Sequence, residues 1–169
     1  MKTQITTTIA VILLATSSFA QSAAIKPEFV DMLLKPYFEL QDALASDDLA
    51  RSQEHAKSFD AMLGHGPSVN DAPSLAELGD ASQKIVAATS IADARAAFLS
   101  LSSTLTKLVE EVGTTSQSDI MLMHCPMAFG GKGGDWLQNH SEIANPYFGS
   151  MMYRCGSMKK KLVSVPGKH

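Results

Sequence analysis

Sulfur donors are concentrated in the last third of this chain. Both cysteines, Cys125 and Cys155, lie there, and so do six of the nine methionines. Those methionines are Met121, Met123, Met127, Met151, Met152 and Met158. Thiolate and thioether sulfur select Cu(I) above harder divalent ions. The composition of this region therefore predicts a soft-metal site, with Cu(I) as the expected ion and Ag(I) as a second candidate.

Two short segments supply the candidate ligands. Cys125 and Met127 form the first pair, Met152 and Cys155 form the second, and His124 precedes the first cysteine. One thiolate and one thioether from each segment can satisfy Cu(I) without any carboxylate. Zinc fits less well, because its structural sites are closed tetrads of cysteine and histidine. These five residues are the predicted metal ligands.

A disulfide between Cys125 and Cys155 is the alternative use of the same residues. Exported proteins with an even number of cysteines commonly form such bonds. Closing a loop of about thirty residues would stabilise the fold by roughly 3–4 kcal/mol in the chain-entropy model. The two states can also alternate, with copper bound only by the reduced protein. The cysteines alone leave both interpretations open.

The first twenty residues are typical of a secretory signal peptide. Lys2 is followed by an apolar core, Ile9 to Ala15, that is too short to span a bilayer, and small residues then lead to Ala20. Cleavage is expected after Ala20, with Ala24 as the second choice. No later apolar run approaches the eighteen or so residues that a membrane helix needs. The mature chain is therefore expected in the periplasm, without insertion into the membrane.

Composition bounds the fold and the partners. The formal net charge is −3, and removal of Lys2 with the signal makes it −4, which does not favour nucleic acid as a partner. About 150 mature residues make one domain of ordinary size, expected over 21–169. Aromatic residues are only 7% of the chain, and dense runs of β-branched residues are missing from its first two thirds. The body is therefore expected to be mainly α-helical.

Four segments have the spacing of amphipathic helices. The first runs from about Pro27 to Leu44, where Pro36 must either kink it or start it late. The second is predicted to follow a cap at 46–48 and to end at Gly64. A capping box at 74–77 is expected to open the third.

The fourth helix has the clearest pattern. It is predicted to begin at the cap 90–93 and to end at Gly113. Apolar residues recur along it at steps of three or four: Ile91, Ala94, Phe98, Leu101, Leu105, Leu108 and Val112. Short connections between helices of similar length favour an antiparallel four-helix bundle.

The chain changes character after Gly113. A small, irregular C-terminal lobe rich in Cys and Met is expected over about 119–169, packed on one end or side of the bundle. Within it, Ile120 to Met123 and Leu162 to Val165 are predicted as short extended segments. Trp136 to His140 is predicted as a helical turn.

The chain resembles a bacterial envelope domain of unknown function, which occurs alone and fused to the C-terminal end of HlyD-type periplasmic adaptors of heavy-metal efflux pumps. Six stretches carry the resemblance: Tyr37 to Asp48, Ala94 to Ser100, His124 to Ala128, Gly134 to Gln138, Ile143 to Gly149 and Met152 to Gly156.

The resemblance implies a helical-bundle domain associated with copper or related soft-metal handling. Cys125 and Met127 match the family's Cys-Pro-Met, and Met152 and Cys155 match its closing Met-x-x-Cys-Gly. His124 precedes the first motif. We expect a periplasmic adaptor of a heavy-metal efflux pump to be a separate partner.

Signals for catalysis are weak. The sequence contains no Cys-x-x-Cys redox pair and no serine in a nucleophile elbow. Cys125 with the adjacent His124 is the best catalytic pair, yet no third group is evident. The predicted function is therefore binding and not catalysis: a protein that buffers copper or passes it to an efflux system. The alternative is a metal-free, disulfide-stapled interaction module of an envelope complex.

Overall fold

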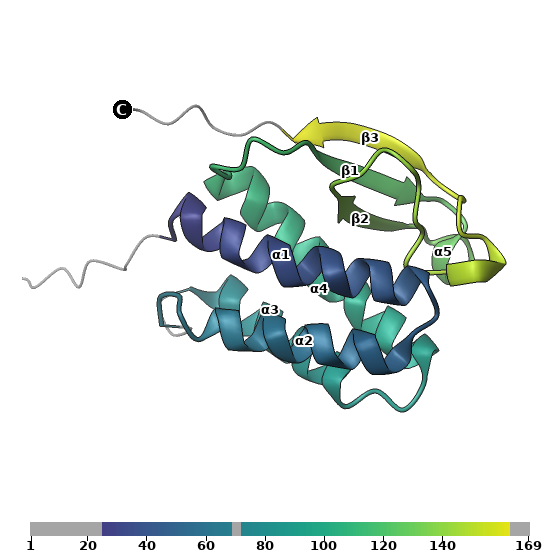
Figure 1. The fold of residues 1–169 in the computed structure, drawn as a ribbon, viewed down its shortest axis with the longest axis horizontal. Helices are drawn as coiled ribbons and strands as arrows, with labels where there is room; N and C mark the ends of the chain where they lie inside the picture. The colour runs from purple at the N-terminus through teal and green to yellow at the C-terminus, as the bar shows by residue number, and fades with distance from the viewer. Residues whose placement is uncertain (1–24, 69–71, 163–169) are drawn as a thin grey trace, which may run out of the picture.

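A computed structural model describes residues 25–68 and 72–162 of the chain (Figure 1). The signal peptide predicted over 1–20 lies outside the described residues. So does most of the extended segment predicted at Leu162 to Val165.

Four long helices form the first part of the molecule. They are α1 (Pro27–Ala45), α2 (Leu49–Leu63), α3 (Pro73–Val86) and α4 (Ile91–Val112). Each helix packs against the next along the chain, and α4 also packs against α1 (Figure 1). The prediction of a mainly helical fold is confirmed. No helix in the described part of the chain is long and apolar enough to cross a membrane.

Side-chain caps start two of these helices within the segments where a cap was predicted. The carboxylate of Asp48 accepts a hydrogen bond from the N–H of Arg51 at 3.0 Å and opens α2. The hydroxyl of Ser90 accepts one from the N–H of Asp93 at 3.1 Å and opens α4. Gly113 ends α4 with a φ of 85°, a conformation that favours glycine.

The starts of the other two helices differ from expectation. The N-cap of α3 is Ala72, followed by Pro73, so the predicted capping box at 74–77 is wrong. Proline suits the first helical position because its missing N–H would have no partner there. The carboxylate of Glu77 instead accepts a hydrogen bond from Thr104 at 3.2 Å, across to α4. Helix α1 does not begin late and continues past a buried Pro36.

The two serines near these helix starts give a matched test. We expect Ser90→Ala to lower the free energy of unfolding by about 1 kcal/mol, because the substitution removes the cap of α4. Ser74→Ala should change it by less than about 0.5 kcal/mol, because Ser74 caps nothing. Urea denaturation of both variants measures the difference, and equal losses would contradict the assignment of the α3 start.

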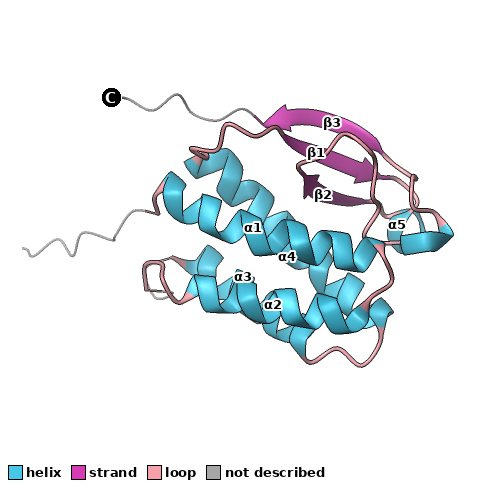
Figure 2. Cartoon of the chain, viewed as in Figure 1, coloured by secondary structure: helices cyan, strands magenta, loops and turns pink. Residues whose placement is uncertain are grey.

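The C-terminal lobe is a small sheet, where an irregular lobe was expected. Its strands are β1 (Ile120–Cys125), β2 (Gly134–Gln138) and β3 (Ser157–Leu162). They are antiparallel, in the order β2-β1-β3 (Figure 2). The prediction of a helical turn at Trp136 to His140 is therefore wrong, because Trp136, Leu137 and Gln138 pair with β1. A four-residue turn, α5 (Ala128–Gly131), joins β1 to β2, and η1 (Gly149–Met151) precedes β3.

The sheet lies over the side of the helices formed by α1 and α4 (Figure 1). Buried aromatic rings pack between the sheet and these helices. Tyr37 of α1 stacks on Phe98 of α4 with ring centroids 5.3 Å apart. Trp136 of β2 is fully buried and meets Tyr147 edge-on at 5.9 Å. Such ring pairs stabilise the fold beyond the area that they bury.

Hydrogen bonds from α1 to the main chain of the lobe add to this packing. The buried Tyr37 hydroxyl accepts from the N–H of Leu137 at 2.9 Å, and it pairs with the Ser102 hydroxyl at 2.7 Å. The side-chain amide of Gln41, one turn further along α1, donates to the carbonyl of Ala144 at 2.7 Å. The helices and the lobe therefore share both a core and polar contacts.

Candidate metal-binding site

The structure brings the two cysteines together. Cys125 is the last residue of β1, and Cys155 lies two residues before β3. Their sulfur atoms are 3.3 Å apart, and both residues are free cysteines. A disulfide bond is about 2.05 Å long, so these are two thiols in contact. Cys125 is buried, whereas Cys155 is partly exposed.

The thiol contact perturbs one of the partners. The hydrogen bond with Cys125 and the burial of the group both raise the pKa of the Cys155 thiol. Only the thiolate is a metal ligand, so this environment holds the proton when no cation is present. A soft cation bound between the sulfurs would favour the thiolate form and release that proton to solvent.

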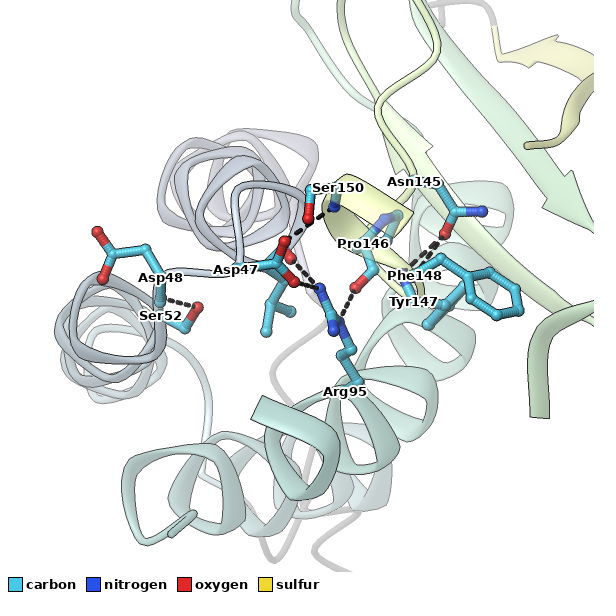
Figure 3. Close-up of polar contacts among 10 residues, drawn as sticks. Asp47, Asp48, Ser52, Arg95, Asn145, Pro146, Tyr147, Phe148 and Ser150 are labelled. Carbon is cyan, nitrogen blue, oxygen red and sulfur yellow. Dashed lines mark hydrogen bonds and ion pairs between the residues drawn. The ribbon is translucent and has the colours of Figure 1, made fainter. Parts of the chain in front are cut away.

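Asn145 fixes the backbone that carries Cys155. Its buried side chain accepts from the N–H groups of Tyr147 at 2.8 Å and Phe148 at 3.3 Å (Figure 3). It also donates to the carbonyl of Cys155 at 2.7 Å. The N–H of Asn145 donates to the carbonyl of Tyr153 at 2.8 Å. The side chain of Asn145 thus bonds to the main chain both at Tyr147 and Phe148 and at Cys155, so the position of Cys155 depends on it.

The two predicted methionine ligands lie close to the cysteines along the chain. Met127 sits in the turn after β1, two residues from Cys125, and is 56% exposed. Met152 is linked to Cys155 by a tight turn, in which the N–H of Cys155 donates to the Met152 carbonyl at 2.9 Å. The neighbouring Met151 is 81% exposed. Exposed thioethers are therefore present on both segments that carry the thiols.

His124 lies on the other face of the sheet. Consecutive strand residues point to opposite faces, so its ring is directed away from the side of Cys125. It lines a hollow beside α4, and its Nδ1 lies 2.6 Å from Oδ1 of Asp135, the residue opposite it on β2. Lys159 donates to the second oxygen of Asp135 at 2.8 Å. His124 thus has partners of its own, away from the thiol pair.

An arginine in α4 ties the loop that follows β2 to the helices (Figure 3). The guanidinium of Arg95 donates to the carbonyl of Pro146 at 2.8 Å, to the carbonyl of Leu44 at 2.7 Å and to the carboxylate of Asp47 at 2.6 Å. Asp47 in turn accepts from the N–H of Ser150 at 2.9 Å. We call Asp47, Arg95, Pro146 and Ser150 the Arg95 clamp.

Gly149 lets the clamp close. Its φ is 57°, in the region that favours glycine, and a Cβ atom there would overlap the side chains of Arg95 and Asp47. The last position of the Asn-Pro-Tyr-Phe-Gly stretch therefore requires glycine, because the loop approaches the Arg95–Asp47 ion pair closely there.

The clamp makes stability depend on pH. Hydrogen bonds from the Ser150 side chain and N–H, with the nearby Arg95 guanidinium, lower the pKa of Asp47 to about 2. A lowered pKa stabilises the folded state above the unfolded value near 3.9, and that contribution is lost as the pH falls toward about 2. We therefore expect the stability gap between wild type and Asp47→Asn to shrink from pH 6 to pH 2.5. Urea midpoints measure it, and a constant gap would contradict the assignment.

Several residues of this site were missed by sequence reasoning. Arg95 and Asp47 are 48 positions apart, and Asp135 becomes the partner of His124 only through strand pairing. Asn145 was visible only as part of an Asn-Pro turn. Across 25–68 and 72–162, no group of three or more His, Cys, Asp and Glu side chains is placed to hold a metal ion. The donors that the structure does bring together are the two thiols.

Comparison with known proteins adds a family but no function. No curated protein and no solved structure is detectably similar to this chain. A family match covers residues 33–117, which is about half of the chain and includes most of the helical part. The motifs from His124 to Gly156 lie outside the matched residues. The chain belongs to the family described as "Protein of unknown function (DUF3347)".

Proposed function

We propose that this protein is a periplasmic Cu(I)-binding protein that buffers copper or hands it to an efflux system, with Ag(I) as a second ion. The observation that carries the proposal is the contact of the two thiols, with sulfur atoms 3.3 Å apart. Two thiolates so placed can share one soft ion. Met127 and Met152, on the same two segments, supply the thioethers that complete the donor set. His124, whose ring is directed away from Cys125 and pairs with Asp135, is left out of it.

The difference in burial between the two cysteines suggests how the ion enters and leaves. Cys125 is buried, so it anchors the ion, while the partly exposed Cys155 faces the route from solvent. Transfer proceeds by ligand exchange, in which an incoming thiol or thioether replaces Met127 or Met152 while the cysteines hold the ion. The recipient in this proposal is a periplasmic adaptor of a heavy-metal efflux pump. The four helices, arranged as an antiparallel bundle, serve as the platform.

The second candidate is a metal-free interaction module stapled by a disulfide between Cys125 and Cys155. The same sulfur contact favours it, because a small approach of the two atoms would allow the bond to form in an oxidising compartment. Oxidation would then stabilise the fold by roughly 3–4 kcal/mol. The two candidates differ in which state is active, since only the reduced protein binds Cu(I).

A competition titration separates these candidates. Mature protein is titrated with Cu(I) under anaerobic conditions against a chromophoric competitor, before and after thiol reduction. The copper proposal expects tight one-to-one binding after reduction only. A failure of the reduced protein to compete would exclude that proposal and leave the disulfide-stapled module.

The methionines give a finer test. Leucine has nearly the volume of methionine but no donor atom. We expect Met127→Leu with Met152→Leu to weaken Cu(I) binding by about tenfold or more, at the scale typical of perturbed metal sites. Met32→Leu, at an exposed methionine of α1, is the matched control and should leave the affinity within twofold. Equal Cu(I) affinity in all variants would show that the thioethers of Met127 and Met152 do not bind the ion.

A further inference from the structure

A groove with basic side chains runs between α4 and the sheet, on the face that carries His124. Two adjoining hollows of about 390 and 220 Å³ form it, and both are lined by Ser103 and Asp135. Four lysines reach it from three elements of the chain. They are Lys107 of α4, Lys132 from the turn before β2, and Lys159 and Lys160 of β3. We call this the basic groove.

A bulge in β3 places two of these lysines on one face. Leu122 is opposite Lys160 and Met123 is opposite Met158, so Lys159 is the extra residue. Such a bulge re-aims the side chains around it. As a result, Lys159 binds Asp135 at 2.8 Å and Lys160 binds Glu110 of α4, also at 2.8 Å. Both side chains cross from the sheet edge toward α4.

The remaining two lysines carry the uncompensated charge. Among the described residues, the side chains of Lys107 and Lys132 make no ion pair or hydrogen bond, whereas the two acids of the groove, Glu110 and Asp135, are already paired. The groove therefore has an excess of positive charge in a chain whose net charge is −3. A local field opposite in sign to the whole protein favours a partner with negative charge.

The length of the groove indicates the form of that partner. Along α4 the lining runs from Leu99 to Glu110, which at 1.5 Å per residue is about 16 Å. An extended peptide covers that distance with about five residues. A small oxyanion would occupy only one of the two hollows, so the spread of lysines along both fits a segment with several carboxylates.

We propose that the basic groove binds an extended acidic segment of a partner protein. Its carboxylates pair with Lys107 and Lys132 in the same way that Glu110 and Asp135 already pair with Lys160 and Lys159. This binding does not require the thiols or copper, so it can be tested on the reduced, metal-free protein.

Hexaglutamate labelled with fluorescein is the probe, and fluorescence anisotropy at low salt measures its binding to the mature protein. Replacing Lys107 and Lys132 together by Gln should weaken binding by roughly fivefold or more, because two exposed charge pairs are lost. The matched control replaces Lys57 and Lys84, exposed lysines of α2 and α3, by Gln and should stay within twofold of wild type. Higher salt should weaken wild-type binding.

Several results would overturn the proposal. They are the absence of hexaglutamate binding at millimolar protein, an equal loss of affinity in the control variant, and displacement of hexaglutamate by inorganic phosphate at a concentration equal to that of the peptide.

Amide chemical shifts of the wild-type protein provide a measurement without mutation. Changes on adding hexaglutamate should concentrate around Ser103, Lys107 and Lys132, and changes scattered over α2 and α3 would reject the groove. Cu(I) affinity does not enter any of these readouts.

Discussion

Cys155→Ser is expected to weaken Cu(I) binding by at least about a hundredfold. A hydroxyl is a hard, protonated group that cannot replace a thiolate for a soft ion. Loss of a direct ligand should exceed the ten- to hundredfold that changes around metal sites typically cost. The partly exposed position of Cys155 makes the substitution tolerable for the fold. Competition with a chromophoric chelator, on reduced protein without oxygen, measures the affinity.

Cys125→Ala provides the second arm of this experiment. It removes the buried thiol without burying a new hydroxyl, and it should reduce affinity to a similar extent. Urea denaturation of the metal-free variants controls for folding. A Cu(I) affinity within threefold of wild type in both folded variants would show that the thiol pair is not the copper site.

Arg95→Ala is expected to lower the free energy of unfolding by about 2–4 kcal/mol. Arg95 is mostly buried, with 11% of its side chain exposed, and it donates to Leu44, Pro146 and Asp47. Hydrogen bonds from a charged donor are the stronger class, and the substitution leaves their acceptors without a partner. Chemical denaturation measures the loss.

The control is Arg51→Ala, at an exposed arginine of α2, where we expect a change of less than about 0.5 kcal/mol. Arg95→Lys should be intermediate, because lysine keeps the charge but not the planar fork that reaches three oxygens. Because Pro146 and Asn145 are adjacent, Arg95→Ala should also weaken Cu(I) binding, by about tenfold. Equal stability of the Arg95 and Arg51 variants would show that the Arg95 clamp does not hold the lobe.

The helices could be predicted because their signals are local. Apolar spacing and the caps at Asp48 and Ser90 lie within one helix each, and Gly113 marks an end by its own conformation. The predicted start of α3 was wrong because two competing signals for a helix start lie side by side. Pro73 suits the first turn as well as Ser74 suits a cap, and the proline prevailed.

Strand β2 could not be predicted because its strand character comes from pairing with β1 and not from its own sequence pattern. Gly134 to Gln138 is short, begins with a glycine and is stabilised by pairing with β1. The extended character of Ile120 to Met123 was recognised, but the structure continues that strand to Cys125. Had that continuation been assumed, strand alternation would have separated His124 from Cys125 at once.

The meeting of the cysteines was implicit in both sequence interpretations, since a metal site and a disulfide each require it. The groups that position them were not visible in the same way. The side chain of Asn145 bonds to main-chain atoms of other residues in its loop. The Arg95 clamp joins α4, the loop after α1 and the loop after β2. No spacing rule connects residues that only the fold brings together.

The hydrogen bonds from α1 to the lobe have a consequence for the cooperativity of unfolding. The N–H of Leu137 is buried under the Tyr37 hydroxyl, and Gln41 holds the carbonyl of Ala144, so the lobe cannot open without breaking contacts of the helical core. We expect the Leu137 amide to exchange its hydrogen only through global unfolding. Residues 33–117, the part matched by the family, would then not form an independent folding unit, because α1 would lose the partners of both side chains.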